Sequence, residues 1–442
     1  MAQNFLACDR DQAYLMPPSL RDWLPGDQLA WCVLDAVAEM DLSAIYGDYR
    51  ADGHGRAAHD PAMMVALLLY AYAVGERSSR GIERRCQIDV AFRVIAANQV
   101  PDHATIARFR VRHQDALGEL FGQVLGLCGR SGMVSLGVIA LDSTKVAANA
   151  SGLANRTYEQ IAAEILAEAE AVDAAEDALF GEARGDELPA ELADPTSRKA
   201  RLRAAKRQMD AELQAAQQAH REHLQERAER EGELGRKLGG RKPKPPAQQV
   251  DPETRMNVTD LDSRSVKTPR GFIQGYNAQA VATADQIIIA ADVLVGGADQ
   301  GLLEPMIRAA AAELEGAGIE IDLDVALADA GYWKTEQIQQ LWQDGIQALV
   351  PPDGAIDREG KGDRRRTGGL YDYMRRVLAA DHGKTLYRQR GQTIEPIFGQ
   401  TKHNRRADRF QRRGRAACRS EWRLITATHN LLKLHRNAIA AA

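Results

Sequence analysis

VIALDSTK, residues 138–145, is a short apolar run that ends on an acidic residue, Asp142. Its length, with glycines at 132 and 137 before it, favours a buried strand over a helix. LDVALADAGYW at 323–333 repeats the pattern, with Asp329 after the apolar residues. Because ligands of open α/β sheets gather at strand ends, the two stretches predict an α/β core with both carboxylates near one edge of its sheet.

The segments that follow alternate between strand and helix patterns. GFIQGYNAQAVATADQIIIAADVLVG at 271–296 predicts two strands with a turn at 283–286. We expect helices at about 301–316 and 334–344, a short strand in IQALVPP at 346–352, and a helical tail from 393 to 436. The result is a mixed sheet with flanking helices.

A helical insertion interrupts this core. Residues 156–235 are rich in Ala, Glu, Gln and Arg and are broken at 181–195, which predicts two long helices paired as a hairpin or loose coiled coil. GRKLGGRKPKPPAQQ at 235–249 has the composition of a flexible linker. We therefore expect an insertion and linker at 156–250 between two parts of one core domain, 131–155 and 251–436.

Residues 1–130 form a mostly helical N-terminal domain in this interpretation. Asp60 and Pro61 are suited to cap and start a helix that stops at Gly75. A helix in 77–97, a turn at 98–101 and a helix capped by Asp102 follow, and the last helix would present Arg108 and Arg112 on one side. The pattern fits a DNA-binding helix-turn-helix and, equally, an Arg-rich face of a helical bundle.

Composition bounds the function classes. The 442 residues carry 45% hydrophobic and 27% charged residues, a globular balance with room for two or three domains. The five cysteines are scattered and include no C-x-x-C pair, which argues against a disulfide framework and a zinc site. The sequence contains no apolar stretch long enough for a membrane span and no basic start typical of a signal peptide, so we expect a soluble, cytoplasmic protein without a membrane partner.

The net charge of −4 hides a basic C-terminal segment. Residues 364–436 hold about 19 Lys and Arg against about 5 Asp and Glu, the footprint expected of a phosphate binder. A solvated basic surface is an equally good interpretation of the charge alone.

A third acid, Glu395, opens the basic segment in IEPIFGQTKHNRR. Pro396 fits only a first helical turn, so Glu395 is expected at a helix start, with Lys402 two turns further on the same face. Neighbouring carboxylates need a cation, and oxygen ligands without a His or Cys cluster favour Mg²⁺ or Mn²⁺. The candidate phosphate donors are Lys402, His403, Asn404, Arg405, Arg406, Arg409, Arg412 and Arg413.

Each acid taken alone is weak, because a single Asp after a strand usually caps a turn. The combination of two strand-end aspartates, a glutamate on a following helix and a dense cationic face is what indicates metal-dependent phosphodiester chemistry.

Several ordered blocks also resemble a known family: LDSTK at 141–145, TDLDSR at 259–264, GFIQGYNAQAVA at 271–282, ADAGYW at 328–333 and IEPIFGQTK at 394–402. They are similar to those of bacterial insertion-sequence transposases of the DDE class, and HDPAMMVALLLYAY with PDHATIARFR resembles the InsH-type domain that precedes the catalytic core there. The likeness covers most of the chain outside the insertion.

The resemblance implies an RNase-H-like core with Asp142, Asp329 and Glu395 as catalytic and metal-binding residues, and two Mg²⁺ or Mn²⁺ ions about 3.5–4 Å apart. It implies cleavage at terminal inverted repeats, transfer of 3′-hydroxyl ends to target double-stranded DNA, and a homodimer in the DNA complex. Lys402 would hold a phosphate near the cut, and Thr144 and Lys145 would line the strand path. The alternatives are a related nuclease or resolvase without strand transfer, a catalytically inactive DNA-binding derivative, and an RNA-directed RNase-H-like enzyme, which only the family likeness disfavours.

One signature departs from that family's pattern. Related transposases carry Tyr-x-x-Arg-x-x-x-Glu followed seven residues later by Lys. Glu395 and Lys402 match the last two positions, whereas Arg388 and Gly391 stand where Tyr and Arg are expected. Tyr387, Arg388 and Arg390 are candidates to serve from a shifted register.

Overall fold

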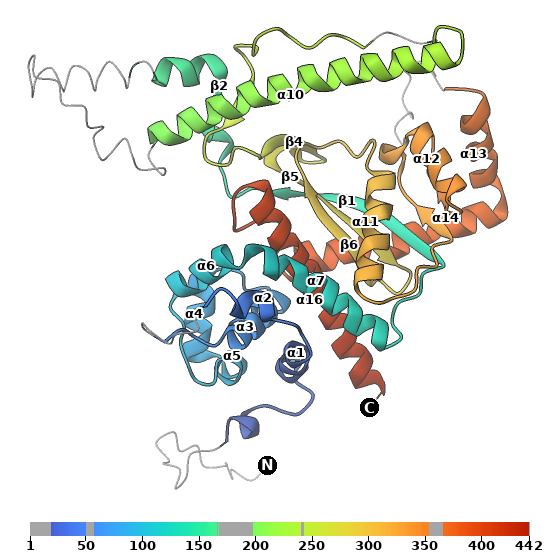
Figure 1. The fold of residues 1–442 in the computed structure, drawn as a ribbon. Coiled ribbons are helices and arrows are strands. Elements are labelled where there is room, and N and C mark those ends of the chain that lie inside the picture. Colours follow the sequence, from blue (N-terminus) through green and yellow to red (C-terminus); the bar gives the residue numbers. More distant parts are fainter. Residues whose placement is uncertain are drawn as a thin grey trace, which may run out of the picture.

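The computed structural model describes residues 19–49, 57–165, 167, 198–239, 243–352 and 366–441, built around one mixed sheet (Figure 1). Its strands are β1 (Val138–Ala147), β4 (Arg264–Thr268), β5 (Gly271–Thr283), β6 (Ile288–Leu294), β7 (Val325–Leu327) and β8 (Gln347–Leu349). The order is β4-β5-β1-β7-β8, with β6 also paired to β5. β1 lies antiparallel to β5 and parallel to β7, so the predicted α/β mixed sheet is confirmed, and it is RNase-H-like.

β1 is longer than expected. The sequence predicted a strand that ends on Asp142, but pairing with β5 continues through Asp142↔Ala280 to Ala147↔Gly275. β7, by contrast, pairs with β1 only as far as Ala140. From Asp142 onward, no strand among the described residues pairs with the β7-side edge of β1, which opens that edge to side chains from elsewhere.

Gly275 explains how closely the strands can run at this end of the sheet. A Cβ built on Gly275 would lie 2.4 Å from the carbonyl oxygen of Val146 on β1. Only glycine permits that backbone approach, since no real side chain tolerates such a distance.

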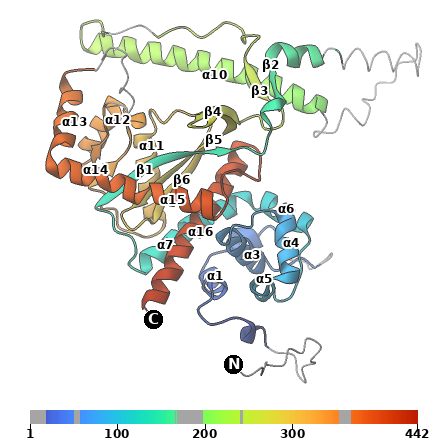
Figure 2. The ribbon, with the colours of Figure 1, turned by 180° about the vertical axis from the view of Figure 1, so that it is seen from behind.

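Helices cover both faces of the sheet (Figures 1 and 2). α11 (Leu303–Gly316) contacts β5 and β6, and α12 (Thr335–Gln343) contacts β8, close to the expected ranges. In the opposite view α14 (Asp381–Thr393), α15 (Glu395–Gly399) and α16 (Arg415–Ala441) lie in front, with α14 against β1 and α16 against β6. α13 (Gly369–Ala379) packs on α14.

The expected helical tail is interrupted. After α15 the chain forms a π-helical turn at Gln400–Asn404, then an irregular loop that runs to α16. In this loop Ala147 N donates to Asp408 O and Phe410 N donates to Ala147 O. The loop therefore lies beside the end of β1 because the strand backbone binds it there.

The N-terminal part is helical, as expected. Its elements are a 3₁₀ turn (Leu20–Trp23), α1 (Leu29–Ala38), α2 (Ser43–Tyr46), α3 (Pro61–Ala73), α4 (Ser79–Ile88), α5 (Val90–Ile95), α6 (His103–Arg112) and α7 (Gln114–Arg130). Asp60 caps α3 through the amides of Ala62 and Met63, and Gly75 adopts φ +82°, which confirms the predicted start and stop.

The segment expected as one helix at 77–97 is two helices. Asp89 leaves the helical region, with ψ 124°, and its carboxylate caps α5, so α4 ends at Ile88. Ala97 and Asn98 then take positive φ in the turn before α6, where Asp102 accepts from Thr105 N at 2.8 Å. A strong capping residue in mid-segment thus divided the helix.

One hydrophobic core unites the N-terminal helices with the sheet. Buried residues of α1, α3, α7, the sheet and α16 belong to the same contiguous cluster, which includes Leu67, Phe121, Val281 and Trp422. No described helix has the length and apolar character needed to cross a membrane.

The insertion has a small core of its own. α10 (Arg198–Glu233) packs through Leu202, Ala205 and Met209 on Ile161 and Met256. β2 (Asn155–Thr157) pairs antiparallel with β3 (Arg255–Asn257) at its base. A helix at 158–165 precedes α10 in the chain. The remainder of the first predicted helix and the predicted break at 181–195 lie outside the described residues. Figure 1 shows α10 at one end of the molecule, opposite the N-terminal helices.

Candidate active site

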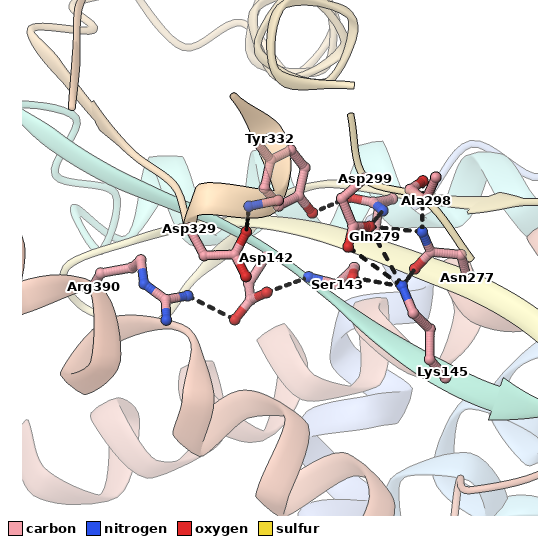
Figure 3. A network of polar contacts seen from close by, with 11 residues as sticks. Asp142, Ser143, Lys145, Asn277, Gln279, Ala298, Asp299, Asp329, Tyr332 and Arg390 are labelled. Carbon is pink, nitrogen blue, oxygen red and sulfur yellow. Dashed lines mark hydrogen bonds and ion pairs between the residues drawn. The ribbon is translucent and has the colours of Figure 1, made fainter. Parts of the chain in front are cut away.

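The two predicted aspartates meet at the open edge of β1. Asp329 follows β7 by two residues and caps a 3₁₀ turn, Ala330–Tyr332, by accepting from Gly331 N at 2.9 Å. Figure 3 shows its carboxylate beside that of Asp142. The parallel pairing of β1 with β7 brings the two acids together, although only Asp329 follows a strand end as expected.

Arg390 from α14 links Asp142 to the third predicted acid. Its guanidinium donates to Asp142 Oδ2 at 2.8 Å and lies 3.5 Å from Glu395 Oε1. Asp142 and Arg390 are mostly buried, with side chains 17% and 16% exposed, whereas Glu395 is 62% exposed. One cation therefore connects carboxylates from the sheet and from the helix.

Burial and neighbouring charges shift the pKa values of both Asp142 and Arg390. Burial raises the pKa of Asp142, and the negative charge of Asp329 raises it further, while Arg390 and the Ser143 amide oppose the shift. Burial is the largest single effect on the pKa of Arg390 and lowers it, but the charge and hydrogen bond of Asp142, with Tyr387 and Asp329, together raise the net pKa. The site thus concentrates negative charge that needs a cationic partner.

Tyr387 lies beside the same acids. Its hydroxyl donates to Ala328 O at 3.3 Å, and burial raises its pKa while Arg390 opposes that shift. Tyr387 and Arg390, three residues apart, are the tyrosine and arginine of the site, and Arg388 is exposed. The shifted register expected for the Tyr and Arg positions is therefore the one that faces the acids.

Glu395 opens α15 with Pro396 in its first turn, as expected. Lys402 lies in the π-helical turn that follows, not in a regular continuation of α15. Its ammonium donates to Thr144 Oγ1 at 3.0 Å and to the carbonyl of Lys145 at 2.8 Å, and burial lowers its pKa. The ammonium of Lys402 thus lies against β1 at Thr144, which is two residues along the strand from Asp142.

The donor chemistry of the three acids fits a hard divalent cation, because it consists of carboxylate oxygens around a site of excess negative charge. The guanidinium of Arg390 is the cation found between Asp142 and Glu395 in this structure. Within the described ranges, no three His, Cys, Asp or Glu side chains are arranged closely enough to hold a metal ion. The three acids thus fit the ion by charge and ligand type, whereas their spacing in this structure is not that of a metal site.

Lys145 corrects an expectation. It was expected to line a DNA path, but its ammonium donates to Asn277 Oδ1 at 2.8 Å and Ser143 Oγ at 3.1 Å and pairs with Asp299 at 3.4 Å. Its neighbours along β1 alternate between sheet faces, so Lys145 lies on the face opposite Thr144. The structure commits this lysine to an internal ion pair.

The predicted DNA-binding residues fall into separate groups. Arg405 is buried, 6% exposed, and its guanidinium donates to Ile425 O and the hydroxyls of Thr428 and Thr401. The expectation that Arg405 binds DNA is thus corrected, because its donors stabilise the end of the π-helical turn against α16. Arg412 is half-buried and donates to Gln114 Oε1.

The remaining candidates are exposed: His403, Asn404, Arg406, Arg409 and Arg413 near β1, and Arg108 and Arg112 on α6. Arg409 and Arg413 each use one donor on the backbone of Ala148 and Asn149. Since a guanidinium has five N–H donors, both keep donors for another ligand. Arg112 lies over the Tyr49 ring at 4.9 Å and bonds to the Asp48 carbonyl.

Sequence reasoning missed Asp299, Asn277, Gln279 and Tyr332 as members of the site. Asn277 and Gln279 are fully buried at alternate positions of β5, and such amides inside an apolar strand are a usable signal, because buried polar groups need partners. Asp299 lies in the loop after β6 and had no such signal.

Comparisons with known proteins identify two transposase domains in the chain. A family described as a transposase domain (DUF772) matches residues 18–112, and a transposase DDE domain matches residues 253–431. The second match includes Asp329, Glu395 and Lys402, while Asp142 precedes it. No curated protein and no solved structure matches the chain. With both transposase domains in their order along an RNase-H-like fold, the chain belongs to the insertion-sequence transposases of the DDE class.

Proposed function

We propose that this transposase cuts DNA at the ends of its own element and joins the resulting 3′-hydroxyls to target DNA, with Asp142, Asp329 and Glu395 as its catalytic carboxylates. The observation that carries the proposal is Arg390, which contacts Asp142 from the sheet and Glu395 from α15, while Asp329 lies beside Asp142. Carboxylates that gather around a guanidinium in this way form a site that favours a positive charge.

The three carboxylates would hold Mg²⁺ or Mn²⁺, which supplies Lewis acidity toward phosphate oxygens and activates a hydroxyl nucleophile. The side chains supply position. Lys402 is fixed on β1 by Thr144 and the Lys145 carbonyl, from where its ammonium can hold a phosphate oxygen of the strand to be cut. Tyr387 bonds to the Ala328 carbonyl next to Asp329 and supports the turn that carries this acid.

The exposed basic and polar side chains suggest where DNA lies. His403, Asn404, Arg406, Arg409 and Arg413 follow the catalytic helix beside the end of β1, and we assign them to phosphates of the element end. We assign residues 1–130, with Arg108 and Arg112 on α6, to end binding, residues 131–155 and 251–436 to catalysis, and 156–250 to an insertion. Pairing two ends requires a homodimer on DNA in this proposal.

The test uses the inverted-repeat DNA that flanks the coding region. Asp142→Asn, Asp329→Asn and Glu395→Gln should each lower metal-dependent cleavage by at least about a hundredfold. Binding to end DNA should stay within about twofold, because the substitutions remove no phosphate contact. Asp344→Asn, in an exposed ion pair with Arg308 at the end of α12, is the control and should cleave normally.

A second assay separates transposition from its alternatives. Precut end DNA with a free 3′-hydroxyl is incubated with a target plasmid and divalent cation, and joined products are measured on a gel. Cleavage without joining would identify a nuclease that lacks strand transfer. A wild-type chain that binds the ends and neither cuts nor joins them would identify an inactive DNA-binding derivative.

A further inference from the structure

The position of Asp329 is not fixed by the sheet itself. β7 ends at Leu327, and the last backbone bond of this strand toward β8 is Ala328 N to Leu349 O at 3.2 Å. Asp329 therefore begins the turn to Tyr332 without a strand partner, beside the like charge of Asp142. Something other than the ladder has to hold it there, because adjacent carboxylates repel each other.

Asp299 lies against that turn from the loop between β6 and α11. A Cβ built on Gly331 would lie 3.0 Å from Asp329 Oδ1 and 3.7 Å from both Cβ and Oδ2 of Asp299. The backbone at Gly331 is thus enclosed between the two acids. A Cβ there would be in ordinary contact with Asp299 and would crowd the Asp329 carboxylate by a few tenths of an ångström.

Asp299 is held from β5 and β1. Its Oδ1 accepts from Asn277 Nδ2 at 2.7 Å and Gln279 Nε2 at 2.9 Å, and Lys145 Nζ lies 3.4 Å from Oδ2 (Figure 3). Asn277 and Gln279 are fully buried. Three donors thus converge on a carboxylate whose side chain is 17% exposed and hold it in place, since its departure would break all three contacts.

Gln279 connects Asp299 to the turn that begins at Asp329. Its amide nitrogen donates to Asp299, while its amide oxygen accepts from the hydroxyl of Tyr332, the last residue of the turn that begins at Asp329. Tyr332 is fully buried. Burial raises the pKa of Tyr332, and the charges of Asp299, Asp142 and Asp329 raise it further, so the phenol stays protonated and donates.

We propose that Lys145, Asp299, Gln279 and Tyr332 form a side-chain bridge across β1 and β5 that fixes Asp329 beside Asp142. Asp299 and Tyr332 are positioning residues in this arrangement. The proposal deepens the proposed function, since it rests on Asp329 being a catalytic carboxylate. The bridge consists only of side chains of this chain, which makes it testable apart from catalysis.

The test compares Tyr332→Phe and Asp299→Asn with Tyr276→Phe. Tyr276 is a matched control: it is also fully buried, lies on the same strand as Gln279, and donates its hydroxyl to Asp260 Oδ1 at 2.6 Å. Hydrogen–deuterium exchange of the metal-free protein is followed in the peptide spanning 326–334. Both bridge variants should exchange faster in this peptide, and Tyr276→Phe should match the wild type there.

Two functional readouts follow. Mn²⁺ binding, measured by electron paramagnetic resonance without DNA, should weaken by at least about tenfold in both bridge variants, the usual cost of losing a partner that orients a ligand. Single-turnover cleavage should fall by a similar factor with unchanged KM for end DNA. A purely structural role would instead lower Tm alike in Tyr332→Phe and Tyr276→Phe and leave Mn²⁺ affinity intact.

Unchanged exchange in the 326–334 peptide, with Mn²⁺ affinity equal to the wild type, would overturn the bridge. Failure of the proposed function gives a different result: the wild-type chain then neither cleaves its end DNA nor binds Mn²⁺. In that case faster exchange in the two bridge variants still supports the bridge, and unchanged exchange still refutes it.

Discussion

At the residue scale the site depends on one guanidinium placed among three acids. Arg390 lowers the pKa of Asp142, against the larger effect of burial and the smaller effect of Asp329, both of which raise it. A carboxylate binds a divalent cation only when it is ionised. Arg390 therefore acts on the protonation of Asp142 as well as on its position.

Replacing this guanidinium should move the pH dependence of the reaction. In Arg390→Gln the pKa of Asp142 should rise, because its nearest opposite charge is lost, and the acidic limb of single-turnover cleavage should move up by about one pH unit. Arg388→Gln, two residues away on the same helix and exposed, is the control and should keep the wild-type profile. A profile that does not move in Arg390→Gln would show that Asp142 is not the group titrating on that limb.

Lys145 and Lys402 show that chemistry alone does not define a residue's role. Both are lysines near Asp142, yet Lys402 lies on the Thr144 side of β1 and Lys145 pairs with Asp299 on the other. The alternation of side chains along a strand separates them. Of these two lysines, only Lys402 remains a candidate to contact DNA.

At the element scale α16 connects the basic segment to the sheet through buried polar groups. His429 Nε2 contacts the carbonyl of Gln286 in the β5–β6 turn at 3.0 Å, and Asn430 bonds to both backbone groups of Ile288. Burial, followed by the positive charge of Arg405, lowers the pKa of His429 to about 3. His429 is thus neutral in the folded chain at ordinary pH.

This buried histidine should make the fold acid-sensitive. Since the folded pKa is depressed below the unfolded value of 6.5, the unfolded chain binds more protons between the two values, and stability falls as pH drops from about 6.5 toward 3. The slope from one such group is about 1.4 kcal/mol per pH unit. The His429→Gln variant keeps an amide donor for the Gln286 carbonyl. Between pH 6.5 and 5, its free energy of unfolding in urea should fall by about 2 kcal/mol less than that of the wild type.

His403→Gln is the control for that measurement, because its ring is exposed in the π-helical turn. It should unfold with the same pH dependence as the wild type. If His429→Gln also does so, the acid sensitivity lies in other groups.

At the scale of the whole molecule the N-terminal helices and the sheet are one folding unit, and the insertion is a separate attachment. α16 packs on α3, α7 and β6 within the main core, whereas α10 packs in a separate cluster with Met256. Arg77 adds polar contacts across the first boundary, donating to Glu421 Oε1 at 2.9 Å and to the Arg406 and Arg409 carbonyls. The loop that carries Arg406 and Arg409 is therefore bound by Arg77 on one side and by the end of β1 on the other.

The insertion should be removable. Because Thr157 pairs with Arg255 in the β2–β3 ladder, a short Gly-containing turn can join these residues in place of 158–254. With Met256→Ser to replace the side chain that loses its cluster, we expect a soluble protein whose Tm stays within about 10 °C of the wild type. Calorimetry and size-exclusion chromatography measure this outcome.

Deletion of residues 1–112 is the contrasting variant. It exposes apolar surface of α16 that α1 and α3 cover, and should give insoluble protein. A soluble, cooperatively folded product from that deletion would contradict a shared core, just as loss of folding on removal of 158–254 would contradict a separate one.

The sequence by itself determined the features that depend on neighbouring residues. The start of α3 at Asp60–Pro61, the turn between β5 and β6, and the helix start at Glu395–Pro396 all follow from capping, periodicity and the fixed φ of proline. The choice of Asp142, Asp329 and Glu395 as a set also came from the sequence, and the structure brings Asp142 and Asp329 together and connects Glu395 through Arg390.

Only the tertiary structure decided the rest. β1 extends past Asp142 because β5 pairs with it, Arg405 is buried because α16 packs on it, and Lys145 meets Asp299 from 154 positions away in the chain. Local patterns carry no information about such partners, since burial and ion pairing depend on which distant segments share the core. The tertiary structure therefore selected Arg390 over Arg388 and placed Asp299 beside the turn of Asp329.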